Sequence, residues 1–345
     1  AKIDDIIKTE LLEIKEKYPT PRKTEIIMDY SDIDIGDLIA KHDVVISLTS
    51  QGYIKRLPVG EYKTQHRGGR GVNAHKTKEE DFVTDMFVVN SHDDIMLFSN
   101  LGKVYVMKAY VLPEAGRQNK GRALVNLLPL ESEEKINTIL KFERGEDTFL
   151  MLATKDGLVK KTKITDYSNV RKTGLAAITL REDDELIEVK FTDGNQEIIL
   201  ATKYGQCIRF SEDDVRGTGR TSMGVRGINL ADQDEVIGMI CIKDPETESI
   251  MVVSEQGYGK RSDIEDYRIT NRGGKGVKTL NITEKTGKLV AIKTVTDEND
   301  LMIINKSGIT IRMKVEDVRI MGRATQGVRL INLEKRNDQI GSVCK

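Results

Sequence analysis

The chain has 345 residues, a length that suits one large repeat-built domain or two ordinary ones. Its 54 Lys and Arg nearly balance its 55 Asp and Glu, so net charge gives no indication of a nucleic-acid partner. No apolar run is long enough to cross a bilayer, and no leader peptide is recognisable. Three widely spaced cysteines argue against a disulfide framework or a cysteine zinc site. We therefore expect a cytoplasmic protein without a membrane partner.

The first 18 residues differ from the rest of the chain. Ile3, Ile7, Leu11 and Ile14 recur at helical spacing among Glu and Lys residues, and the prolines at 19 and 21 end the pattern. The segment is predicted to be one amphipathic helix. Two interpretations stay open: the helix lies on the following domain, or residues 1–18 are the tail of a helical region in a longer protein.

A glycine that follows a short apolar strand recurs through the remaining sequence. The six positions are Gly52, Gly102, Gly157, Gly205, Gly257 and Gly308, at intervals of 50, 55, 48, 52 and 51 residues. The strands expected before them are 44–48, 95–98, 149–153, 198–201, 250–253 and 301–304. A glycine suits the tight turn that joins such a strand to the next, because it adopts a positive φ easily. The period is typical of a repeat protein.

A second glycine marks each repeat 17 to 19 residues after the first. These glycines are Gly71, Gly121, Gly174, Gly224, Gly276 and Gly327. Two further short strands are expected after each one, such as 228–230 and 236–240 in the fourth repeat. Four strands in each of six units predict an all-β, six-bladed, propeller-like ring over 24–345. The segment 24–28 is expected to pair with the last unit and close the ring.

Charge is strongly segregated within the repeats. The segments from the first glycine to just past the second contain 29 Lys and Arg but only 11 Asp and Glu. Because the same segment is basic in all six units, the ring is predicted to carry a positive zone around it. Such a zone neutralises phosphates without reading bases. Aromatic residues, the usual stacking platforms for single strands, are only 5% of the chain, which favours duplex DNA.

The first repeat carries a glycine-rich basic loop, Gln65-His66-Arg67-Gly68-Gly69-Arg70-Gly71. Glycines let a backbone approach a phosphate closely, and arginines supply charge in a fork that matches it. The fifth repeat has a near copy at 271–276, and the other repeats keep partial versions.

This loop resembles the gyrase-A box of the C-terminal domain of DNA gyrase A subunits, commonly Q-[RK]-R-G-G-[RK]-G. Only His66 departs from that pattern, which puts one charge contact in doubt. The residues at 22–26 and 52–56 agree with the family too, and the resemblance covers essentially the whole chain. It implies a six-bladed β-pinwheel that wraps DNA in a positive, right-handed sense, with 1–18 as the helical tail of the breakage-reunion domain.

The resemblance also implies partners and site residues. The partners would be duplex DNA, the N-terminal domain of the gyrase A subunit, and the gyrase B subunit, in an A2B2 complex near the nucleoid of a bacterium. Gln65 through Gly71 would be required for wrapping. The basic rim is predicted to consist of Lys55, Arg56, Arg117, Lys120, Arg122, Lys160, Lys161, Arg171, Lys172, Arg209, Arg216, Arg220, Lys260, Arg261, Arg272, Lys275, Arg312 and Arg323.

No catalytic or metal-binding motif is recognisable. The sequence lacks a GxxxxGK[ST] loop, HExxH and paired CxxC, and its four histidines show no ligand spacing. The family's DNA-cleaving tyrosine follows an arginine, and no Arg-Tyr pair occurs here. The segment is therefore expected to be non-catalytic and to hold no cofactor, while ATP and Mg²⁺ act elsewhere in an ATP-dependent type II topoisomerase.

Two alternatives remain. The C-terminal domain of topoisomerase IV A subunits has the same architecture, usually with a degraded box or fewer blades. A propeller used as a protein-docking platform is the alternative from another class.

Overall fold

The computed structural model describes residues 2–24, 35–59, 81–116, 119–142, 145, 148–333 and 338–345. The chain forms two compact units, Ala1–Ile39 and Ala40–Lys345. The smaller unit contains the helix α1 (Lys2–Lys17) and the short 3-10 helix η1 (Ile35–Leu38).

The predicted N-terminal helix is confirmed. Asp4 and Asp5 lie in the first turn of α1 and Lys15 and Lys17 in its last, which suits the helix dipole. No residue of α1 is buried, so its apolar stripe is exposed. Among the described residues, no helix has the length and apolar character needed to span a membrane.

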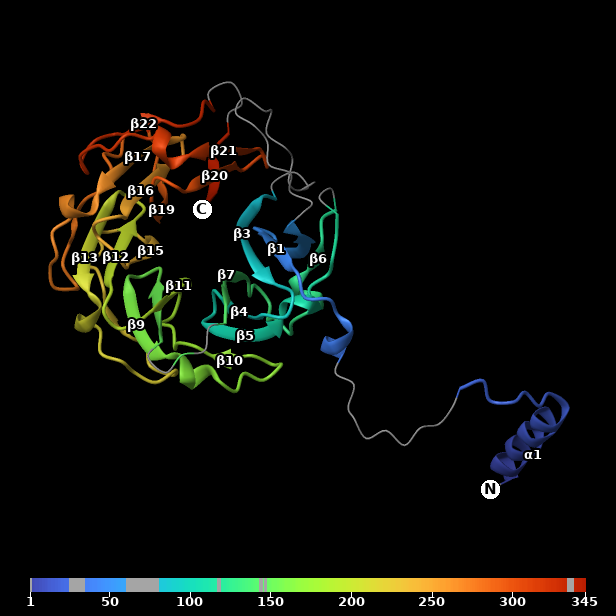
Figure 1. Ribbon diagram of the computed structural model, residues 1–345. Coiled ribbons are helices and arrows are strands. Elements are labelled where there is room, and N and C mark those ends of the chain that lie inside the picture. Colours follow the sequence, from blue (N-terminus) through green and yellow to red (C-terminus); the bar gives the residue numbers. More distant parts are fainter. Residues whose placement is uncertain are drawn as a thin grey trace. The chain divides into compact units, whose positions relative to one another are not determined.

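The larger unit is a ring of six antiparallel sheets, or blades, around a central axis (Figure 1), as predicted. From the inside outwards, blade 1 consists of β3 (Val83–Asn90), β1 (Asp43–Thr49), β2 (Tyr53–Pro58) and β6 (Arg122–Ala123). Blade 2 consists of β7 (Ile136–Lys141), β4 (Asp94–Ser99), β5 (Lys103–Lys108) and β10 (Leu175–Ala176). Blade 3 consists of β11 (Leu186–Thr192), β8 (Phe149–Thr154), β9 (Leu158–Lys163) and β14 (Val225–Arg226).

The remaining blades follow the same plan. Blade 4 consists of β15 (Val236–Ile242), β12 (Glu197–Thr202), β13 (Gln206–Ser211) and β18 (Val277–Lys278). Blade 5 consists of β19 (Leu289–Val295), β16 (Ser249–Ser254), β17 (Tyr258–Asp263) and β22 (Val328–Arg329). The described part of blade 6 consists of β23 (Ile340–Cys344), β20 (Asp300–Asn305) and β21 (Thr310–Lys314).

Short 3-10 helices connect these strands. They are η3 (Ala109–Val111), η4 (Leu124–Asn126), η5 (Ile164–Tyr167), η6 (Glu212–Asp214), η7 (Ile264–Asp266) and η8 (Val315–Asp317).

The outermost strand of each four-stranded blade comes from the next repeat. In blade 3, for example, β14 pairs with β9 through Val225 and Val159, although β14 follows the hairpin of blade 4 in the chain. The third strand of the fourth repeat was expected at 228–230, and this expectation is wrong. The strand begins directly after Gly224, whose φ of +86° turns the chain onto the neighbouring blade.

The second glycine of a repeat marks this crossing. A Cβ on Gly224 would lie 2.5 Å from the carbonyl oxygen of Val159, and one on Gly121 would lie 2.5 Å from that of Ile54. Any side chain at these positions would therefore push the donated strand off the blade that receives it. The 17-to-19-residue spacing is the length of chain needed to reach that blade.

Hydrophobic cores lie between blades. Along the middle strand β8, Leu150 and Leu152 pack in a core with blade 2, whereas Met151 and Ala153 pack in a core with blade 4. Alternate residues of a strand point to opposite faces, so each middle strand is buried on both sides. This explains why these strands are continuous apolar runs.

The ring closes between blades 1 and 6. The inner strands contact one another in turn, and β23 contacts β3. Ser342 Oγ donates to the carbonyl oxygen of Val83 at 2.5 Å, and Val83, Ile304 and Cys344 share a small core. Of the segment 24–28 that was expected to close the ring, 25–28 lie outside the described residues.

The crossing glycines provide a matched test. Gly52 and Gly224 both have a positive φ, but a Cβ on Gly52 meets nothing within 4 Å. We expect Gly52→Ala to cost about 1 kcal/mol of unfolding free energy from backbone strain alone. Gly224→Ala should cost about 2 kcal/mol more, because the donated strand must move. Urea unfolding of both variants measures the difference, and equal losses would contradict the crossing role of Gly224.

Candidate nucleic-acid interface

In repeats 2 to 6, the later described part of each basic segment lies on the outer side of the ring. After the second strand of a blade, the chain passes through a 3-10 helix and runs along the outer edge of the preceding blade to the donated strand. We call these stretches rim loops 2 to 6; they comprise 109–121, 164–174, 212–224, 264–276 and 315–327, of which 117 and 118 lie outside the described residues. Isolated bridges such as Lys161 to Gly217 attach them to the blade below. Figure 1 shows β6, β10 and β22 on the outside of the ring.

Three lysines of the predicted rim are buried beneath these loops. Lys55, Lys160 and Lys260 are at most 1% exposed. Lys160 Nζ donates to the carbonyl oxygens of Ala177, at 2.5 Å, and of Arg220. Burial lowers the pKa of Lys160 to about 7 and the pKa values of Lys55 and Lys260 to about 8. The expectation that these side chains face a ligand is wrong in this structure.

The fourth residue after the first glycine also bonds to protein atoms in four blades; it is Arg56, Lys161, Arg209 and Arg261 in blades 1, 3, 4 and 5. Arg209 Nη1 donates to the carbonyl oxygens of Ile264 and Tyr267, at 2.9 and 2.8 Å, and its Nη2 lies 2.6 Å from Glu197. Lys161, Arg209 and Arg261 are buried, and only 13% of the Arg56 side chain is exposed. Each donates to a carbonyl oxygen in or beside the 3-10 helix that follows the second strand of the next blade. The expectation that these side chains are exposed is wrong for Lys161, Arg209 and Arg261, and Arg56 is exposed only slightly.

Three rim arginines bridge neighbouring blades while remaining partly exposed. The Nη1 atoms of Arg220, Arg272 and Arg323 donate to the last carbonyl of an adjacent outer strand, in Ala176, Arg226 and Lys278. The distances are 3.4, 3.0 and 3.0 Å. Each guanidinium has five N–H donors, so such a bond orients the side chain and leaves further donors.

Of the other predicted rim residues within the described chain, six lie at the surface; Lys120 does not, because its Nζ is buried. Arg122, Arg171, Lys172, Arg216, Lys275 and Arg312 are exposed. Lys120 is half-buried, with Nζ 3.8 Å from the ring centroid of Tyr53, and Arg312 pairs with Asp300. Gln65, His66, Arg67, Gly68, Gly69, Arg70 and Gly71, together with Arg117, lie outside the described residues.

Five exposed cations on the same circumference were missed by the sequence analysis. Arg226, Lys278 and Arg329 each end an outer strand, two residues after the second glycine. Arg268 and Arg319 are equivalent to Arg216, directly after a buried residue of the 3-10 turn. The alternation of a strand could have identified the first three, because the valine before each one points inwards.

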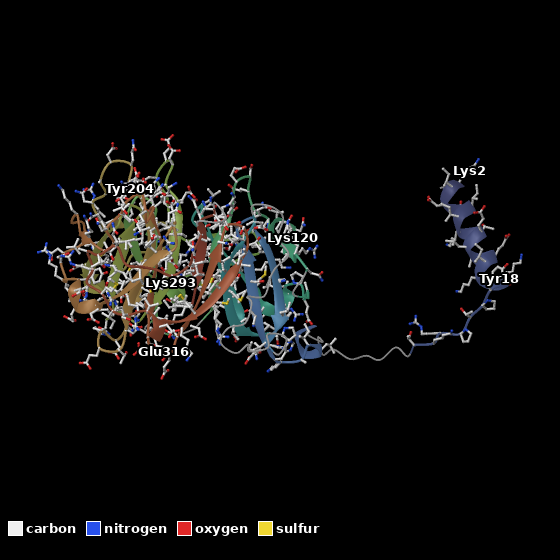
Figure 2. All side chains as sticks on the ribbon, turned by 90° about the horizontal axis from the view of Figure 1, so that it is seen from above. Lys2, Tyr18, Lys120, Tyr204, Lys293 and Glu316 are labelled. Carbon is white, nitrogen blue, oxygen red and sulfur yellow. The ribbon has the colours of Figure 1, made fainter. Side chains whose placement is uncertain are left out.

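Some acidic residues lie at the end faces of the ring. The 3-10 helices contribute exposed pairs such as Glu316 and Asp317, and Asp234 lies at the other end beside Tyr204, whose N–H donates to it at 3.1 Å. Figure 2 shows Tyr204 and Glu316 at opposite ends of the ring.

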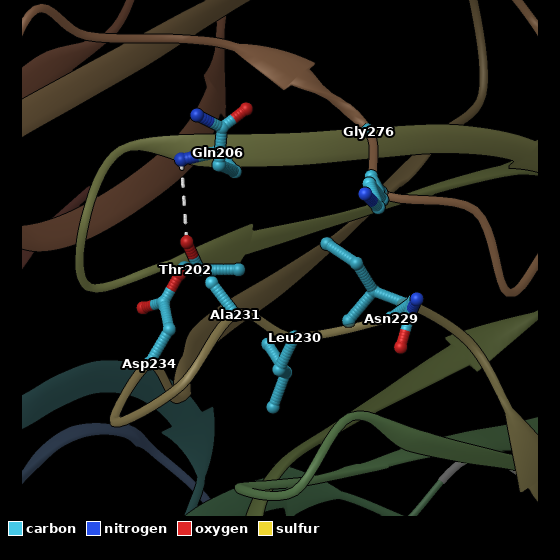
Figure 3. A pocket seen from close by; sticks show the side chains of 9 residues that line it. Thr202, Gln206, Asn229, Leu230, Ala231, Asp234 and Gly276 are labelled. Carbon is cyan, nitrogen blue, oxygen red and sulfur yellow. Dashed lines mark hydrogen bonds between the residues drawn. The ribbon is translucent and has the colours of Figure 1, made fainter.

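A pocket of about 440 Å³ lies beside the rim (Figure 3). Its lining residues are Thr202, Gln206, Ile228, Asn229, Leu230, Ala231, Asp234, Lys275 and Gly276. The two charged residues in this lining have opposite signs, so it provides no anion site of its own. Within the described ranges, no group of three His, Cys, Asp or Glu could hold a metal ion.

Known proteins share this architecture and sequence. The family model for the DNA gyrase C-terminal domain, a β-propeller, matches residues 43–90, 93–143, 148–193, 196–243, 248–296 and 299–343. The DNA gyrase A subunit of Staphylococcus aureus strain NCTC 8325 / PS 47 is 45% identical over 331 residues, which are 95% of this chain and 37% of that protein. The chain thus spans little more than a third of the length of this relative.

Two solved structures are similar. A DNA gyrase A C-terminal domain matches with a TM-score of 0.75 and 28% identity, over 88% of this chain and 99% of that one. The C-terminal domain of a DNA topoisomerase IV matches with a TM-score of 0.71 and 26% identity, over 88% and 93% of the two chains. The six matched segments coincide with the six sequence repeats, and the chain therefore belongs to the DNA gyrase C-terminal domain family of β-propellers.

Proposed function

We propose that this chain is the non-catalytic C-terminal domain of a DNA gyrase A subunit, which bends and wraps duplex DNA around its circumference. The observation that carries the proposal is the repetition of exposed cations at equivalent places on successive blades. Arg216, Arg268 and Arg319 form one such series, and Arg226, Lys278 and Arg329 form another.

The physical argument is electrostatic. Bending a short duplex by 40–90° costs about 1–6 kcal/mol, and phosphate contacts distributed along an arc can offset that cost. Contacts of this kind are sequence-independent and weaken steeply with salt. Wrapped DNA would present a neighbouring segment for strand passage and so permit ATP-driven negative supercoiling.

The proposal places the chain in a larger enzyme. Its partners would be the N-terminal domain of the gyrase A subunit, and the gyrase B subunit, in an A2B2 complex that would use ATP and Mg²⁺ outside this domain, in a bacterial cytoplasm. The full-length gyrase A protein that is 45% identical to this chain supports this placement. The homologous chain of topoisomerase IV is the alternative, because a domain of that enzyme has nearly the same fold.

The outer strands provide a first test. Replacing Arg122, Arg226 and Lys278 with alanine should reduce the slope of log K against log salt by about 0.9 for each lost phosphate contact, in binding to a long duplex. A control variant with Lys135, Lys243 and Lys306 replaced loses the same charge from exposed positions that belong to neither the rim loops nor the outer strands. Equal slopes for the two variants would argue against a circumferential path.

The topology of bound DNA provides a second test. Nicked plasmid ligated in the presence of the domain should shift in linking number, and in the positive sense if the resemblance to the family holds. The same reaction without protein is the reference. An unshifted distribution at saturating protein would overturn wrapping while leaving simple binding possible.

Supercoiling by the reconstituted holoenzyme provides a third test. The full-length gyrase A protein, combined with its gyrase B partner and ATP, should introduce negative supercoils into relaxed plasmid. Replacing Arg67 and Arg70 with alanine should abolish most of this activity and weaken simple DNA binding only modestly, because five other basic segments remain. If the unaltered enzyme produces no negative supercoils, the gyrase assignment fails and topoisomerase IV is favoured.

A further inference from the structure

The third residue after the first glycine alternates between two chemical classes around the ring. Blades 1, 3 and 5 have lysine there, and blades 2, 4 and 6 have Tyr105, Ile208 and Ile311. The rim loop that lies over each lysine belongs to repeat 2, 4 or 6. These three loops share the pattern Gly-Arg-X3-Gly, at 116–121, 219–224 and 322–327, and the loops of repeats 1, 3 and 5 lack it.

The structure shows what the lysines bind. Lys260 Nζ donates to the carbonyl oxygens of Gly322, at 2.7 Å, and Arg323. Lys160 donates to that of Arg220, and Lys55 to those of Gly116 and Asn119, at 3.2 and 2.9 Å. In all three cases a buried nitrogen is bonded to the backbone of a Gly-Arg-X3-Gly loop.

A buried ammonium group is costly unless it is hydrogen-bonded, and the loop carbonyls satisfy this requirement. Burial lowers the pKa of each of the three lysines, and the neutral amine retains two N–H donors for the same carbonyls. These hydrogen bonds therefore favour the position of the loop over the lysine.

The attachment of the loop to the lysine also fixes the position of the loop's arginine. In Arg220 and Arg323, the backbone carbonyl accepts from the buried lysine, and the guanidinium donates to the adjacent outer strand. Both ends of the residue are held before any ligand arrives. Such preorganisation lowers the entropy lost when the side chain contacts a phosphate.

We propose that Lys55, Lys160 and Lys260 are positioning residues that hold the Gly-Arg-X3-Gly loops for DNA, so that the interface repeats every two blades rather than every blade. This inference rests on the proposed function. The lysines do not touch DNA themselves. Lys160 and Lys260 act through Arg220 and Arg323 in the loops that cover them. Tyr105, Ile208 and Ile311 of the other blades place no ammonium group beneath a loop.

The variant Lys160→Ile tests, in the absence of DNA, whether Lys160 holds the loop at 219–224. Isoleucine occupies the equivalent position in blades 4 and 6, so the variant is expected to fold, which circular dichroism and thermal unfolding check. Tryptic cleavage after Arg220 should accelerate severalfold, and cleavage after Arg272, whose loop lies over Ile208, should not change. Ile208→Val is the matched control and should leave both rates unchanged. An unchanged rate of cleavage after Arg220 in the folded Lys160→Ile variant would show that Lys160 does not hold the loop.

A double-mutant cycle on the full domain tests the positioning role. Lys160→Ile and Arg220→Ala should each weaken long-duplex binding up to about fivefold and lower the salt slope by about one contact. The double variant should be no weaker than Arg220→Ala alone, because Lys160 acts through Arg220. Additive losses would overturn the positioning role. Failure of the unaltered domain to bind DNA would overturn the proposed function instead. The cleavage result would still show whether Lys160 holds the loop.

Discussion

The structure depends on the exchange of one short strand between successive blades. A two-residue strand adds few hydrogen bonds by itself, yet it ties each sheet to the repeat that follows. The chain must then run back along the outer edge of the preceding blade, and this return path creates the rim loops. The circumference that carries the cations is therefore a product of strand exchange, and a propeller whose blades kept their own outer strands would lack it.

The exchange divides the basic residues into two groups. Cations on the second strand, such as Lys160 and Arg209, are covered by the returning loop, and its carbonyl oxygens become their partners. Cations in the loop and on the donated strand, such as Arg216 and Arg226, remain outside. The first group joins blades together and the second faces solvent. Positive charge in the repeat thus serves both cohesion and the proposed DNA interface.

The alternation of lysine and apolar residues beneath the loops gives the ring an approximate three-fold repeat of blade pairs. The glycine-rich loop of repeat 5 lies over Ile208. Its Arg272 bonds to the adjacent outer strand as Arg220 and Arg323 do, and Gly273 N–H donates to the carbonyl oxygen of Gly227. The described rim loops are therefore held in two ways, over a buried lysine or over an uncharged side chain.

The amino-acid sequence by itself determined the six repeats, the all-β class, the position of the hairpin turns and the N-terminal helix, because glycine period and apolar runs are local signals. It also determined that charge is segregated. Only the tertiary structure decided which cations are buried. Lys160 and Lys275 both lie in the basic segment of their repeat, but a loop from the next repeat covers Lys160 and leaves Lys275 exposed. The destination of the donated strand was equally hidden: Val225 follows its glycine at a fixed spacing, but the blade it joins is set by packing between repeats that no local pattern records.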